Sequence, residues 1–175
     1  MPRGIKATKL TLSLPFGIGS IDFEPNDVQK KAAWSLYVEL VSRISVQPMK
    51  ENEGLLREAL SSLYSVFAVT RQILKDAGPD VAAGGKNSVG FVALEVLNRG
   101  LRPVLTEWHP RLEDYEQGRE AGVSRVKHER AWGEYKTLQK KLENLRVGML
   151  DYATALGKIA GVDLPLTTET EEKSK

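Results

Sequence analysis

Two side chains near the middle of the chain have the types that acid–base chemistry on a phosphate ester requires. Arg102 and His109 are separated by six residues. Histidine suits proton transfer near neutral pH, and arginine suits the negative charge that develops on a phosphate during transfer. The two residues therefore form a candidate catalytic pair.

The spacing of this pair resembles the Arg-then-His motif of HEPN-type ribonucleases, which are small helical bundles. The resemblance implies that Arg102 and His109 act on the 2′-hydroxyl and the scissile phosphate of RNA without a metal. Pro103 departs from the polar residue that usually follows the arginine in that family. In an alternative interpretation, His109 lies in the last turn of a helix that Trp108 anchors in the core, where its ring nitrogens meet free carbonyls.

A second candidate surface is a basic stretch between residues 118 and 146, in which glutamates offset half of the positive charge. It is either the solvated face of the last helix or a strip that contacts phosphates on RNA or DNA. It lacks the interleaved aromatic residues of a platform that stacks single-stranded bases. The nucleic-acid-binding candidates are Arg125, Lys127, Arg130, Lys136, Lys140 and Lys141.

Tryptophans flank the apolar stripes of the expected helices and supply a third candidate site. A tryptophan beside such a stripe is either the rim of the core or an anchor for a partner protein. The partner-binding candidates are Trp34, Trp108 and Trp132.

Several classes of chemistry find no support in the composition. The chain has no cysteine, which excludes disulfides, thiol nucleophiles and cysteine-based zinc sites. The loop Gly84–Ser88 departs from a phosphate-binding loop, because Asn87 follows its lysine and the loop follows a helix. No Glu-x-x-His pair is present, so we expect no metal and no cofactor. No run approaches the roughly 18 apolar residues of a membrane span, which favours the cytoplasm.

The elements that would position these residues are mostly helical. A short β-hairpin is expected over about residues 5–24, lying against the helices or adding to a partner's sheet. Asn26 and Gln29 are typical of a capping box at the start of a first helix, which should end near Gln47–Pro48. A second helix is expected from about Gly54 to Ala77.

The third and fourth helices complete the expected fold. The third should begin near Ser88 and be kinked or split at Pro103, with a further break near Pro110. The fourth carries an unbroken heptad seam, which His128 extends at its start and which predicts coiled-coil-like packing. The seam residues are Ala131, Tyr135, Leu138, Leu142, Leu145, Met149, Tyr152, Leu156 and Ile159.

The sequence therefore predicts a mainly α single domain over residues 1–162, a four-helix bundle with an N-terminal hairpin, followed by a disordered tail over 163–175. Amphipathic helices with few inward polar residues favour a noncatalytic protein-interaction or assembly subunit of an intracellular complex. The segment 101–110 resembles uncharacterised bacterial proteins, which implies that the complex is bacterial. Its partner would be another protein or a second copy of the chain. The alternatives are the ribonuclease and a sequence-independent nucleic-acid-binding protein.

Overall fold

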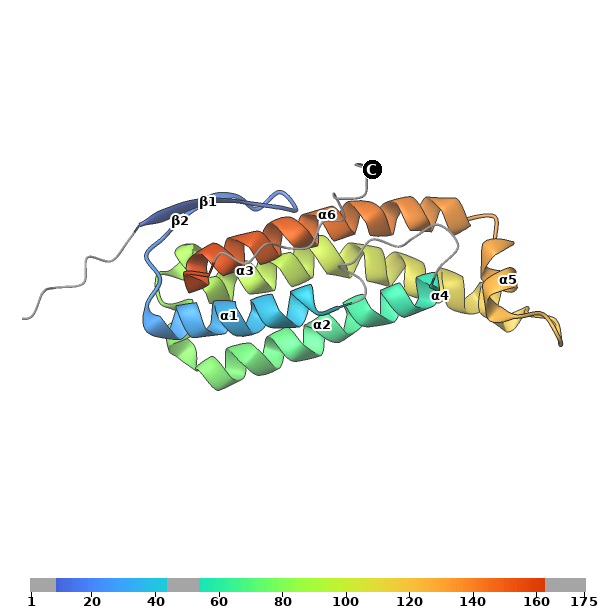
Figure 1. Cartoon of the computed structure of the whole chain (residues 1–175), viewed down its shortest axis with the longest axis horizontal. Helices are drawn as coiled ribbons and strands as arrows, with labels where there is room; N and C mark the ends of the chain where they lie inside the picture. Colours follow the sequence, from blue (N-terminus) through green and yellow to red (C-terminus); the bar gives the residue numbers. More distant parts are fainter. Residues whose placement is uncertain (1–8, 44–53, 163–175) are drawn as a thin grey trace, which may run out of the picture.

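The computed structural model describes residues 9–43 and 54–162, and it is mainly helical with a short antiparallel hairpin near the N-terminus (Figure 1). Within these residues, no helix combines the length and the apolar character needed to cross a membrane. The helices are α1 (Asp27–Val41), α2 (Leu56–Ala77), α3 (Val89–Glu95), α4 (Arg102–Gln117), α5 (Arg125–Arg130) and α6 (Tyr135–Ala160). The helical class and the hairpin are confirmed, whereas the elements do not form the plain set of four helices that we expected.

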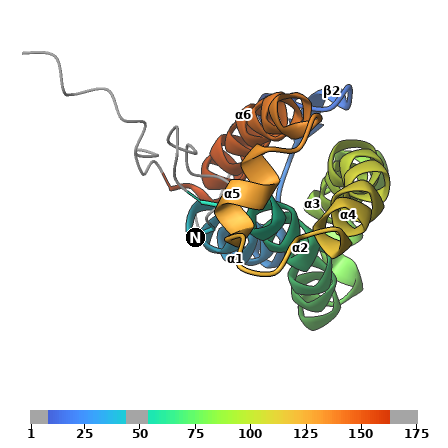
Figure 2. The ribbon, with the colours of Figure 1, turned by 90° about the vertical axis from the view of Figure 1, so that its right-hand side faces the viewer.

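The helices share one apolar core. α1 packs against both α2 and α6, whereas α4 packs against α2. Figure 2, viewed from one end of the molecule, shows α6 beside α1 and α4 beside α2. The buried apolar side chains of the hairpin and of the long helices belong to a single cluster. The surface between α2 and α4 is therefore separate from the surface on which α6 lies.

The ring of Phe16, in the turn of the hairpin, packs the hairpin against the helices. β1 (Leu10–Leu14) pairs with β2 (Gly19–Phe23), and β1 lies against α6. In the turn, Phe16 adopts a positive φ of 61°. A Cβ added at Gly100 would come within 2.7 Å of its ring, and one added at Gly148 within 2.5 Å. The missing side chains of these two glycines thus leave the space that the ring occupies.

The start of α1 is capped as expected, but the second half of the capping box is not formed. Asn26 Oδ1 accepts a hydrogen bond from the Gln29 amide at 2.8 Å. The Gln29 side chain is buried and instead donates to the Ala83 carbonyl at 2.9 Å and accepts from the Val89 amide at 3.1 Å. This holds the connection between α2 and α3 against α1. α1 ends at Val41, and the stop expected at residues 47–48 lies outside the described residues.

The third helix is not interrupted by its prolines in the way that we expected. Ser88 caps α3, and a π-helical segment, η4 (Val96–Leu101), joins α3 to α4 and ends two positions before Pro103. Proline cannot donate to the carbonyl four residues earlier and its ring crowds that turn, which the wider π turn accommodates. The break expected at Pro110 is wrong, because α4 continues through it to Gln117.

The last helix begins later than predicted. The seam is buried from Tyr135 to Ile159, which confirms the heptad pattern over the length of α6. Ala131 is exposed, and His128 belongs to the short helix α5, so these two residues do not extend the seam. The break falls at Trp132–Gly133, where glycine disfavours a helix and the indole packs inward. The expected tail over 163–175 lies outside the described residues.

Candidate functional site

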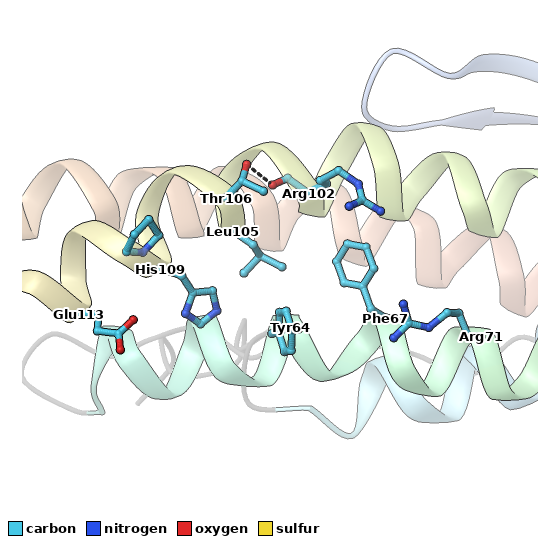
Figure 3. A pocket seen from close by; sticks show the side chains of 9 residues that line it. Tyr64, Phe67, Arg71, Arg102, Leu105, Thr106, His109 and Glu113 are labelled. Atoms are coloured by element: carbon cyan, nitrogen blue, oxygen red, sulfur yellow. Dashed lines mark hydrogen bonds between the residues drawn. The ribbon is translucent and has the colours of Figure 1, made fainter.

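A groove of about 540 Å³ runs between α2 and α4, and both candidate catalytic residues line it (Figure 3). Arg102 and His109 are seven positions apart, and seven positions make about two helical turns, so α4 presents both on one face. α2 contributes side chains at a similar spacing from the opposite wall. The full lining is Tyr64, Phe67, Arg71, Arg102, Leu105, Thr106, His109, Pro110 and Glu113.

One end of the groove is cationic. The guanidinium group of Arg102 lies over the Phe67 ring, 5.3 Å from its centroid, and its Nε donates to Asn98 Oδ1 at 3.1 Å. Arg71 approaches the same ring from α2 (Figure 3). Among the described residues neither arginine has an ion pair with a carboxylate. Two positive groups thus share one end of the groove without a balancing charge.

The centre of the groove is aromatic. Tyr64 is 64% exposed, which is high for a large aromatic residue inside a concave surface. Its ring stands edge-on to His109 at 5.7 Å and tilted against Phe67 at 6.4 Å. Exposed aromatic residues in grooves are common anchors for binding partners.

At the other end, His109 is held by an ion pair from outside the groove. Arg57 Nη1 lies 2.8 Å from His109 Nδ1, and the same guanidinium binds the Glu116 carboxylate through Nε and Nη2 at 2.9–3.1 Å. Because arginine can only donate, Nδ1 accepts, and the neutral ring carries its proton on Nε2. Nε2 is itself buried and lacks a hydrogen-bond partner within the described residues. Neither ring nitrogen is free to exchange a proton with a ligand in the groove.

The surroundings of His109 favour its neutral form. Burial lowers the pKa of the imidazole below its ordinary value of 6.5, and the positive charge of Arg57 lowers it further. The Leu60 carbonyl and the carboxylates of Glu113 and Glu116 oppose this shift, although the carbonyl lies outside hydrogen-bond geometry for Nε2. Because the pKa of His109 is lowered and its Nδ1 is hydrogen-bonded to Arg57, this residue is better suited to a positioning role than to donating a proton.

A buried carboxylate fixes the end of α2 that carries Arg57. Glu129, on α5, is 4% exposed and accepts hydrogen bonds from the amides of Leu56 at 2.7 Å and Arg57 at 3.2 Å. These amides begin α2 and have no partner within that helix. Burial nevertheless raises the pKa of Glu129, and the two amide hydrogen bonds only partly offset that effect. Glu129 is one of the glutamates of the basic stretch, and its carboxylate faces the interior rather than the solvent.

The basic stretch lies at the end of the molecule where α5 and the start of α6 meet (Figure 1). Glu134 pairs with Arg111 at 3.4 Å, and Glu143 pairs with Arg146 at 2.5 Å. None of the candidate cations lines the groove, and none has an ion pair in the part of the chain that is described. The exposed cations are Arg125, Lys127 and Arg130 on α5, and Lys136, Lys140 and Lys141 on α6.

The tryptophans divide into interior and surface residues. Trp108 is 2% exposed and meets Trp132 edge-on at 6.1 Å, while Trp132 also stacks on Tyr115 at 5.5 Å. Trp108 is therefore not accessible as an anchor for a partner, and the part-buried Trp132 packs against the core. Trp34 remains 42% exposed on α1.

The groove contains residues that sequence reasoning did not single out. They are Phe67, the exposed Tyr64 and Arg71, none of which was a candidate site residue. Their spacing of three and four positions places all three on one face of α2, which is a signal available in the sequence. The role of Arg57 had no such signal, because its partners come from α4 and α5.

The site shows no arrangement for a metal, since no three histidine or acidic side chains gather as possible ligands in residues 9–43 and 54–162. The chain matches no protein-family model, no curated protein and no solved structure. The function must therefore be argued from the geometry of the groove and its surroundings.

Proposed function

We propose that this chain is a noncatalytic interaction subunit that binds a partner protein through the groove between α2 and α4. One observation carries the proposal, namely an open groove with an exposed aromatic residue at its centre and unpaired cations at one end. Such a surface supplies apolar contact area together with charges that select a partner. In this proposal the long helices act as a rigid, bundle-like support for the two walls.

The same geometry gives less support to a ribonuclease. A general base needs an unprotonated nitrogen that faces its substrate, and the unprotonated Nδ1 of His109 faces Arg57. Catalysis would require the Arg57–His109 contact to open first. If the wild-type protein cleaved RNA and a folded His109→Ala variant did not, the enzymatic alternative would replace the present proposal.

A displayed library of random 16-residue peptides, selected on the full-length protein, tests the proposed function. The selected peptides are then rescreened against Tyr64→Ser and against Trp34→Ser, which removes an exposed aromatic residue of α1 instead. We expect Tyr64→Ser to abolish binding and Trp34→Ser to preserve it. Peptides that tolerate Tyr64→Ser, or that depend on Trp34, would contradict a docking site in the groove.

Nucleic-acid binding is a second candidate function, because the six candidate cations of α5 and α6 have no ion pair among the described residues, while nearby glutamates are engaged elsewhere. Unpaired exposed cations are the groups that displace counterions from a phosphate backbone. Binding of a labelled RNA should then weaken steeply with salt and fall in a Lys140→Glu/Lys141→Glu variant. Salt-independent binding, or no binding at low salt, would remove this candidate.

A further inference from the structure

The charges in the groove are separated along its length. The arginines Arg71 and Arg102 stand at one end beside Phe67, and Glu113 stands at the other (Figure 3). Neither arginine nor Glu113 has an ion pair within the described residues. A ligand whose charges complement both ends of the groove must be negative where it meets the arginines. It must be neutral or positive where it meets Glu113.

The length of the groove suits a short helix. Its wall on α4 extends from Arg102 to Glu113, about 17 Å at 1.5 Å per residue, which equals three helical turns. The walls are helices whose amides are satisfied internally, so an extended peptide would find few partners for its own backbone. Even the Thr106 hydroxyl is used, since it donates to the Arg102 carbonyl at 2.9 Å. A helical ligand satisfies its own amides and meets the groove through its side chains.

The aromatic centre favours a protein ligand over a nucleic acid. Arg102 covers one face of Phe67, so this ring offers less open surface to a stacking base. A polyanion that extended along the whole groove would also approach the unpaired Glu113. Apolar side chains can fill the space beside Tyr64 and Leu105, because they need no open ring face and carry no charge for Glu113 to repel.

From these observations we infer that the groove takes a short amphipathic helix of a partner protein, apolar toward Tyr64 and Phe67 and acidic at the end that meets Arg71 and Arg102. The inference rests on the proposed function and names the chemistry of the partner. The two guanidinium groups bind carboxylates of the ligand, and the tyrosine and phenylalanine bury its apolar face. The charge of Glu113 fixes the direction in which the helix lies.

The peptides selected on the wild-type protein provide the test. Those that depend on Tyr64 should be enriched in Asp and Glu beside an apolar i, i+3, i+7 pattern. Fluorescence anisotropy of one such peptide should show about tenfold weaker binding to Arg71→Glu/Arg102→Glu, as expected when two ion pairs become repulsive. Lys140→Glu/Lys141→Glu changes the net charge equally on a remote surface and should alter the affinity less than about twofold.

The outcomes separate this inference from the proposed function. Tyr64-dependent peptides with no acidic excess, or with unchanged affinity for Arg71→Glu/Arg102→Glu, would overturn the inference and leave the interaction function standing. If no peptide depends on Tyr64, both fail. A labelled 12-nucleotide uridine RNA is measured in parallel. If it loses affinity with the arginine variant while the peptides do not, the groove binds nucleic acid and the inference is wrong.

Discussion

Replacing Gly148 by alanine should change the stability in opposite directions depending on whether Phe16 is present. In a helix interior this substitution ordinarily adds about 1 kcal/mol of stability. In α6, however, the new Cβ would lie 2.5 Å from Cε1 and 2.6 Å from Cζ of Phe16, closer than the roughly 3.5 Å at which carbon atoms make favourable contact. The opposite edge of the ring faces Gly100, so the ring cannot retreat without approaching a second helix.

The size of the effect follows from two opposing contributions. Overfilling a packed contact costs about 1–3 kcal/mol, and the helix gain of about 1 kcal/mol offsets part of it. Gly148→Ala should therefore destabilise the wild-type protein by up to about 2 kcal/mol. In a Phe16→Ala background the contact is absent, and the same substitution should stabilise by about 1 kcal/mol.

Urea denaturation of the four proteins, followed by helical circular dichroism, measures this double-mutant cycle. The control is Gly133→Ala, because a Cβ there meets no atom within 4 Å and should show no coupling to Phe16. If Gly148→Ala stabilised both backgrounds equally, with a coupling below about 0.5 kcal/mol, the hairpin would not be held in the way described.

Further substitutions test the buried polar contacts. Glu129→Ala should lower the free energy of unfolding in urea by about 2–3 kcal/mol, because two amides of α2 lose their acceptor, whereas exposed Glu120→Ala should not. Burial raises the pKa of Glu129, so the folded state binds its proton more readily. The wild-type free energy of unfolding, minus that of Glu129→Gln, should then rise as the pH falls toward 4.5. A difference that fell over the same range would contradict this. The pKa of His109 is lowered, so its contribution is present above pH 6.5 and is lost as the pH falls through the folded pKa. His109→Gln should flatten that decline in a pH series of urea titrations, and an unchanged slope would count against it. Gln29→Leu should cost about 2–3 kcal/mol in thermal or urea unfolding, because the Val89 amide and a loop carbonyl lose their partners; a cost below 0.5 kcal/mol would mean that water replaces the side chain.

The candidate site could be predicted only in part. The spacing of Arg102 and His109 in the sequence paired two residues that do line one groove. The sequence did not reveal that Arg57 engages the histidine nitrogen, because this contact joins α2 to α4 across 52 positions. The chemistry of a histidine depends on such partners, so its residue type and spacing alone could not decide its role.

The sequence by itself determined the features that depend on neighbours within a few positions. The heptad spacing of α6 buried its seam, and Asn26 and Ser88 capped their helices, since these effects act within one or two turns. Tertiary structure alone decided what distant elements supply to one another. Glu129 caps a helix that begins 73 positions earlier, and Phe16 fills a space left by two glycines on separate helices. Such contacts depend on how helices are placed in space, and local periodicity carries no information about that placement.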